Sequence, residues 1–134
     1  MSTEPEILPL RTGEDVVKVR QAVRSHAMSL GFSLVEQTKI VTAASELARN
    51  TLTHGRGGEA RIERLFEESR RIGLRLTFED HGPGIQDLEL ALKDGYTTGA
   101  GLGLGLNGAR KLSHEFDIWS QVGVGTRVTI ARWK

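Results

Sequence analysis

The sequence contains no cysteine, and only three of its 134 residues are proline. Without cysteine there can be no disulfide, no thiolate metal site and no cysteine nucleophile. With so little proline and 38% hydrophobic residues, a disordered low-complexity chain is excluded. No stretch approaches the roughly 20 apolar residues of a membrane span, and the first residues include no apolar run of signal-peptide length. We therefore expect a cytoplasmic protein with no membrane partner.

The sequence also has no large excess of positive or negative charge, since 18 basic and 17 acidic side chains leave a net charge of +1. Nucleic-acid-binding proteins usually have a strong basic excess or stripe, so we expect no nucleic-acid partner. The four histidines (His26, His54, His81 and His114) have no metal-ligand spacing. The length fits one domain, which we expect to cover residues 1–134.

Glycine, by contrast, is abundant. Sixteen residues are glycine, well above the usual share of roughly 7%. Ten of them lie from Gly82 onward, and five fall between Gly99 and Gly108. Glycine concentrated in one part of an ordinary domain indicates loops where backbone must approach something closely.

Hydrophobic spacing and turn residues predict the secondary structure. The expected elements are an edge strand at 7–10, helices at 15–30 and 33–54, strands at 60–67 and 72–79, a loop-rich segment at 80–101, a helix at 102–113, and strands at 116–122 and 126–132. Asp15 is expected to cap the first helix, and Ser33 with Glu36 to open the second through a capping box. This order predicts a two-layer α/β (α+β) sandwich, with helices on one face of a mixed, mostly antiparallel sheet.

Two polar side chains share one face of the helix predicted at 33–54. Glu46 and Asn50 are four residues apart and lie beside an apolar stripe. A carboxylate and a carboxamide in this arrangement could supply a general base and an oxygen ligand for Mg²⁺. The alternative is a solvated Glu and Asn.

The segment Asp80-His-Gly-Pro-Gly-Ile85 directly follows a predicted strand. An aspartate at a strand end can accept a hydrogen bond from an exocyclic amine such as that of adenine. Gly82 and Gly84 would let the following backbone pass close to a flat ring. A plain turn is the alternative, which Gly-Pro-Gly also favours.

The run from Thr97 to Leu106 alternates glycine with alanine or leucine. Such a run can present several backbone N–H groups to phosphate oxygens, and the dipole of a following helix adds to this. It is not a P-loop, because no Lys-Ser/Thr follows the glycines. The GxGxxG pattern of Gly103, Gly105 and Gly108 has no preceding strand, so the Rossmann context is missing. A flexible loop is the alternative.

The last of these segments, Gly123-Val-Gly-Thr126, lies between the final two predicted strands. It is either a plain hairpin turn or a means of placing the Thr126 hydroxyl near the same adenine.

In this order the four segments resemble the ATP-binding domain of the GHKL superfamily over residues 40–130. From the length of this sequence we expect neither the upstream phosphoacceptor helix of a histidine kinase nor the transducer domain of gyrase, Hsp90 and MutL. It is similar to the small serine/threonine protein kinases of bacterial partner-switching systems, most of all to the stressosome switch kinases. The anti-sigma-factor kinases are a close branch.

The resemblance implies a role for each matching residue. Glu46 would orient or deprotonate the attacking hydroxyl, Asn50 would hold Mg²⁺, and Asp80 would accept a hydrogen bond from the adenine amine. The remaining implied nucleotide-binding residues are Gly82, Gly84, Ile85, Thr98, Gly101, Leu102, Gly103, Gly105 and Thr126.

The implied function is an ATP- and Mg²⁺-dependent kinase whose substrate is a serine or threonine on a STAS-domain protein. After release, the kinase would bind and activate a PP2C-type phosphatase in a stress response. One alternative is an anti-sigma-factor kinase that binds a sigma factor directly, and another is a nucleotide-dependent binding module without transfer activity. We also expect residues 95–105 to be poorly ordered without nucleotide.

Overall fold

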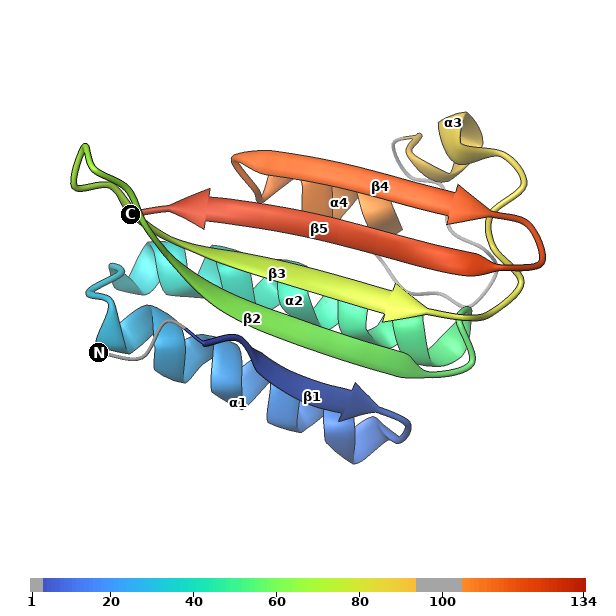
Figure 1. Cartoon of the computed structure of the whole chain (residues 1–134), viewed down its shortest axis with the longest axis horizontal. Coiled ribbons are helices and arrows are strands. Elements are labelled where there is room, and N and C mark those ends of the chain that lie inside the picture. Colours follow the sequence, from blue (N-terminus) through green and yellow to red (C-terminus); the bar gives the residue numbers. More distant parts are fainter. Residues whose placement is uncertain (1–3, 94–104) are drawn as a thin grey trace.

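A five-stranded sheet with helices packed on one face forms the structure, a computed structural model that describes residues 4–93 and 105–134 (Figure 1). The elements are β1 (Glu6–Leu10), α1 (Gly13–Ser29), α2 (Leu34–Thr53), β2 (Gly58–Phe66), β3 (Ile72–Asp80), α3 (Leu88–Ala91), α4 (Gly105–Lys111), β4 (Glu115–Gln121) and β5 (Gly125–Trp133). This is the predicted order of strands and helices, with the short helix α3 added inside the segment predicted to be loop-rich. The part of the last predicted helix before Gly105 lies outside the described residues.

Both long helices begin with a capping box. At α2, the Ser33 hydroxyl accepts from the Glu36 amide at 3.2 Å and the Ser33 amide donates to Glu36 at 3.0 Å, which confirms the prediction. At α1, the prediction that Asp15 is the cap is wrong by three residues. Thr12 is the cap, and Asp15 is the residue whose carboxylate bonds back to it at 3.1 Å. Both residue types cap well, so composition alone did not decide between them.

Replacing Ser33 by alanine should lower the free energy of unfolding by about 1 kcal/mol, because an amide in the first turn of α2 loses its acceptor. Chemical denaturation followed by circular dichroism measures this. Ser29→Ala, at the exposed last residue of α1, is the matched control and should change stability much less. Equal stability of the Ser33 variant and the wild type would contradict the capping role.

The strands lie in the order β1-β2-β3-β5-β4, and all four described pairings are antiparallel. The sheet is therefore built from two hairpins, β2–β3 and β4–β5, with β1 added beside β2. The second hairpin is turned so that β5, the last strand, lies next to β3. This brings Thr126 opposite Asp80 in the register of the two central strands.

The core lies between the sheet and the helices α1, α2 and α4. Its fully buried side chains include Val19 and Val23 of α1, Ile40 and Leu47 of α2, and Leu76 of β3. Among the described residues, no helix is both long and apolar enough to cross a membrane.

The other face of the sheet carries charged side chains. Arg75 of β3 pairs with Glu63 of β2 at 3.2 Å, and Arg127 of β5 pairs with Glu79 of β3 at 3.6 Å. The end of α2, the end of β3 and the β4–β5 turn all lie at one end of the molecule, on the right in Figure 1. Three of the four segments singled out in the sequence are therefore gathered there, and the fourth, from Thr97 to Leu106, lies outside the described residues up to Leu104.

Candidate nucleotide site

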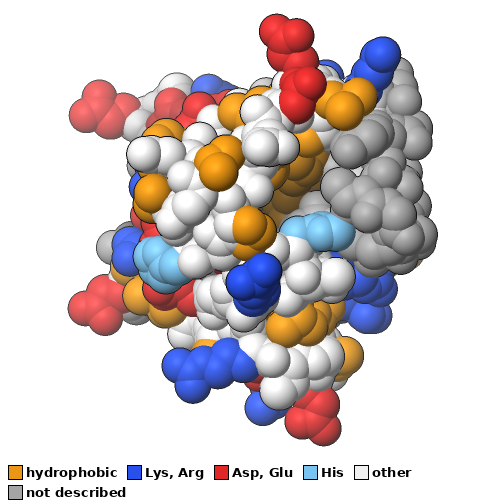
Figure 2. All heavy atoms as spheres, turned by 90° about the vertical axis from the view of Figure 1, so that its right-hand side faces the viewer, with side chains coloured by type: hydrophobic (Ala, Val, Ile, Leu, Met, Phe, Trp, Pro, Cys, Tyr) orange, Lys and Arg blue, Asp and Glu red, His pale blue; other side chains and the backbone are white. Residues whose placement is uncertain are grey.

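A cavity opens at this end of the molecule, between α2, the end of β3, the segment 83–91, the start of α4 and the start of β5. Figure 2 shows it as a hollow with hydrophobic side chains in its depth. Its apolar lining comes from Leu47, Phe78, Pro83, Ile85, Leu90, Ala91, Leu106 and Val128. An apolar cleft with a few polar groups on its walls is the usual form of a small-molecule site.

Of the twelve predicted site residues, a set that includes Glu46, half meet in this cavity. They are Asn50, Asp80, Gly84, Ile85, Gly105 and Thr126. Gly82 lies in an adjoining groove with Gly55, Arg56 and His81, and Glu46 is not among the lining residues. The four remaining predictions, Thr98, Gly101, Leu102 and Gly103, lie outside the described residues. So does the segment expected to be poorly ordered, apart from Gly105 at the start of α4.

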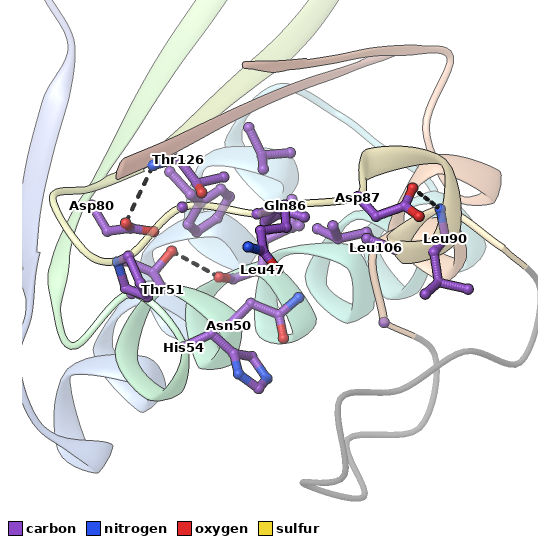
Figure 3. A pocket seen from close by; sticks show the side chains of 18 residues that line it. Leu47, Asn50, Thr51, His54, Asp80, Gln86, Asp87, Leu90, Leu106 and Thr126 are labelled. Atoms are coloured by element: carbon purple, nitrogen blue, oxygen red, sulfur yellow. Dashed lines mark hydrogen bonds between the residues drawn. The ribbon is translucent and has the colours of Figure 1, made fainter. Parts of the chain in front are cut away.

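Asp80 is held rigidly at the wall of the cavity. Its side chain is buried, with 8% of the residue exposed. Its Oδ1 accepts from the backbone amides of Gly82 at 2.9 Å and Thr126 at 3.3 Å, the second of which is drawn in Figure 3. Among the described residues, Oδ2 has no hydrogen-bond donor. The carboxylate thus has one oxygen anchored to the protein and one available to accept a hydrogen bond from a ligand.

The glycines around Asp80 are required by contacts within the protein. A Cβ on Gly55 would lie 2.3 Å from the Asp80 carboxylate, and one on Gly82 would lie 2.6 Å from the Gly55 carbonyl oxygen. Gly84 has a φ of +76°, and a Cβ there would lie 2.4 Å from the Gln121 carbonyl oxygen. The close approach indicated by the sequence is therefore at least partly that of one loop to another, and the approach to a flat ring stays a prediction.

Gly55 follows the end of α2, and the structure shows that its lack of a side chain makes room for the Asp80 carboxylate. Gly55→Ala should displace the Asp80 carboxylate and weaken ATP binding by about 10- to 100-fold, as expected for the loss of one hydrogen bond to a charged group. Isothermal titration calorimetry with ATP measures the change. Gly13→Ala, where no atom lies within 4 Å of the added Cβ, should bind ATP like the wild type. If the Gly55 variant bound ATP as tightly as the wild type, the close fit of Gly55 against Asp80 would have no role in ATP binding.

Ser120 joins the two loops beside Asp80, and no motif in the sequence marks it. Its hydroxyl accepts from the Ile85 amide at 2.8 Å and lies 2.8 Å from the Thr126 hydroxyl. It also donates to the Gly125 carbonyl at 3.1 Å. Ser120 therefore fixes both the loop after β3 and the start of β5. No sequence signal could have pointed to it, because its contact with Ile85 joins residues far apart in the chain.

Four more polar residues line the cavity without having been predicted as binding residues: Thr51, His54, Gln86 and Asp87. Thr51 is buried and donates to the Leu47 carbonyl at 2.9 Å, one turn earlier in α2. His54 extends from the end of α2, beside Asn50 in Figure 3. Asp87 caps α3 through the Leu90 amide at 3.0 Å. None of these residues stands in a motif that would distinguish it from other polar residues of its helix or loop.

Glu46 lies one turn before Asn50 on α2, and only 7% of it is exposed. Its Oε1 accepts from Arg49 Nη1 at 3.3 Å. Its Oε2 is buried and has no hydrogen-bond partner among the described residues. Burial of an unsatisfied carboxylate oxygen costs free energy, which makes Glu46 a candidate for a role in the chemistry of the site.

The cavity residues suit an adenine nucleotide better than a protein-held metal. The apolar walls fit a flat ring, and Asp80 presents an oxygen to an amine at their edge. In residues 4–93 and 105–134, no group of three or more His, Asp or Glu side chains could hold a metal ion. A divalent ion beside Asn50 would therefore depend on phosphate and water oxygens for most of its ligands.

Comparison with known proteins identifies the fold and the family. Residues 35–134 match the model of the histidine kinase-, DNA gyrase B- and HSP90-like ATPases. The chain is 40% identical to the serine/threonine-protein kinase RsbT of Bacillus subtilis over 124 residues, 92% of each chain. It is 31% identical to the anti-sigma F factor of Anoxybacillus flavithermus, over 84% of this chain and 80% of that one.

Among solved structures, the chain resembles the RsbU and RsbW domains of a Mycobacterium tuberculosis protein. The TM-score is 0.63 at 19% identity, over 98% of this chain and 33% of that one. At this identity the likeness concerns the fold alone, and it agrees with the predicted sandwich. The family match and the RsbT similarity each cover most of the sequence. The chain therefore belongs to the histidine kinase-, DNA gyrase B- and HSP90-like ATPase family, and within it to the serine/threonine-protein kinases that include RsbT.

Proposed function

We propose that this kinase transfers the γ-phosphate of ATP to a serine or threonine of a STAS-domain protein and, once released, binds and activates a PP2C-type phosphatase. The observation that carries the transfer step is the buried Glu46, whose Oε2 is unpaired among the described residues one helical turn from Asn50 of the cavity. Similarity to RsbT and to anti-sigma factors supports a partner-switching role.

In the proposed reaction, each polar residue of the site has one task. Asp80 accepts a hydrogen bond from the adenine amine at Oδ2, while its Oδ1 stays bonded to two backbone amides. Asn50 would contribute its amide oxygen to Mg²⁺. Bound Mg²⁺ would neutralise charge on the phosphates, which is the main catalytic need in phosphoryl transfer.

Glu46 acts on the acceptor hydroxyl. Its Oε2 accepts the hydroxyl proton as the hydroxyl oxygen bonds to the γ-phosphorus and the bond to the leaving oxygen of ADP breaks. Arg49 holds the other carboxylate oxygen, Oε1, and so keeps Oε2 as the accepting atom. The remaining predicted phosphate contacts, Gly101, Gly103 and Gly105, keep the role that the family resemblance implies.

The test is incubation of the purified chain with γ-labelled ATP, Mg²⁺ and the STAS-domain proteins of the same organism. We expect label on a serine or threonine of one of them, and capture of a PP2C-type phosphatase by the kinase once that protein is phosphorylated. Absence of label on every STAS-domain protein would refute the proposed substrate.

A second candidate is an anti-sigma-factor kinase, which the 31% identity to an anti-sigma F factor favours. It predicts that a sigma factor co-purifies with the chain and leaves when the antagonist protein is added. If the chain captured a sigma factor and no phosphatase, the anti-sigma-factor kinase would be the correct function. A chain that binds partners in an ATP-dependent way yet never labels them would be a binding module.

A further inference from the structure

The two outer strands of the sheet differ in how well their edges are protected. The strand order makes β1 and β4 the edges. β1 is five residues long and contains Pro9, which has no N–H to offer a further strand. β4 is seven residues long and contains neither proline nor lysine. Among the described strands, only β5 pairs with it, so β4 presents an unprotected edge, the usual template for an added strand.

The core-facing side chains of β4 are incompletely covered. Phe116 and Ile118 pack against the core, yet both are only half-buried. In Figure 1, β4 forms the border of the sheet opposite β1. A further strand beside β4 would remove part of this apolar surface from water, which is favourable.

The opposite side of β4 is acidic. Glu115 and Asp117 extend from it, and the strand has no cationic residue. Glu115 accepts from the Trp133 indole at 2.8 Å, whereas Asp117 is exposed and has no ion pair among the described residues. Next to them, Trp119 is 39% exposed, with the Arg127 guanidinium 5.5 Å from its ring.

This charge pattern selects the kind of strand that fits. In an antiparallel pair of two β4 strands, four carboxylates would gather on one face with no cation from either strand, and like charges on neighbouring strands are destabilising. A strand with lysine or arginine at every second position would instead place cations beside Glu115 and Asp117. Apolar residues between them would cover Phe116 and Ile118.

We propose that the outer edge of β4 binds an extended, basic segment of a partner protein by strand addition. Main-chain hydrogen bonds along the edge would supply affinity, and the alternating side chains would supply specificity. Residues 115–119 are not among those that line the cavity. The proposed surface is therefore separate from the described lining of the cavity, and the proposal does not depend on the function proposed above.

The test uses a fluorescein-labelled peptide of alternating lysine and valine, Lys-Val-Lys-Val-Lys-Val-Lys, titrated with the full chain and followed by fluorescence anisotropy. We expect saturable binding that weakens as salt is added. Asp117→Lys should weaken binding by about tenfold or more, and Asp117→Asn by less, because close charge pairs contribute strongly at interfaces. Glu68→Lys, the same change in the exposed β2–β3 turn, should bind the peptide like the wild type.

A second peptide separates strand addition from simple charge attraction. Lys-Pro-Lys-Pro-Lys-Pro-Lys has the same charge but lacks the N–H groups of the valine positions, and we expect it not to bind. Hydrogen exchange of the amides at 116–120 should slow with the valine peptide only. Equal binding of both peptides, or an Asp117→Lys variant with wild-type affinity, would overturn the proposal. The proposal would also be overturned if the chain associated with itself and the Asp117→Lys substitution disrupted that association.

Discussion

Replacing Glu46 by glutamine is expected to reduce phosphoryl transfer by about 100-fold or more, the usual contribution of a positioned general base. Glutamine has the shape of glutamate but cannot take the hydroxyl proton. Because Glu46 does not line the cavity, the affinity for ATP should stay close to that of the wild type. Transfer from γ-labelled ATP to the STAS-domain substrate measures the first quantity, and calorimetry measures the second.

The control for this variant is Glu89→Gln, at an exposed position of α3, which makes the same chemical change away from α2. It should transfer phosphate at the wild-type rate. Thermal unfolding of both variants checks that the fold is intact, since Glu46 is buried and Glu89 is not. If the Glu46 variant transferred phosphate as fast as the control, Glu46 would not be the base.

Replacing Asp80 by asparagine should weaken ATP binding by about 10- to 100-fold, the effect of losing one hydrogen bond to a charged group. The two backbone amides at Oδ1 require an acceptor, so the asparagine oxygen should take that place. Its NH₂ group then faces the cavity at the position of Oδ2. Because this group and the adenine amine are both hydrogen-bond donors, no hydrogen bond can form between them. Guanine has a carbonyl oxygen at the equivalent ring position, so the preference for ATP over GTP should also fall.

Asp87→Asn is a closely matched control, because it removes the same charge from the wall of the same cavity. Asparagine caps helices about as well as aspartate, so α3 should be preserved. Calorimetric titration of both variants with ATP and with GTP separates a general loss of negative charge from loss of the specific acceptor. If both variants lost ATP affinity equally, Asp80 would have no particular role in adenine recognition.

The sequence predicted the elements well because they rest on local rules. The apolar spacing of α2, its Ser33–Glu36 capping box and the alternation along β3 each depend on residues close together in the chain. The cap of α1 was placed wrongly because Thr12 and Asp15 are both good capping residues, and only the backbone conformation distinguishes them. The same local rules predicted the strands without giving their order in the sheet.

The site was predictable in part for the same reason. Asp80, Asn50 and Thr126 stand in short motifs, and the structure brings all three to one cavity. Ser120 and Gly55 could not be found, because their contacts join residues far apart in the sequence. The orphaned oxygen of Glu46 is a property of packing, which no spacing of residues reveals.

The tight fit of the loops around Asp80 bears on how mutational surveys of this chain should be interpreted. A Cβ on Gly58 would lie 2.0 Å from the Glu79 carbonyl oxygen, and one on Gly125 would lie 2.2 Å from the Asp80 carbonyl oxygen. In a saturation survey scored by growth, these two positions should be as intolerant as Glu46. Their variants should nevertheless be lost through lower protein abundance, whereas Glu46→Gln should accumulate to normal levels and be inactive. Measuring abundance alongside activity would therefore separate the scaffold of the site from its chemistry.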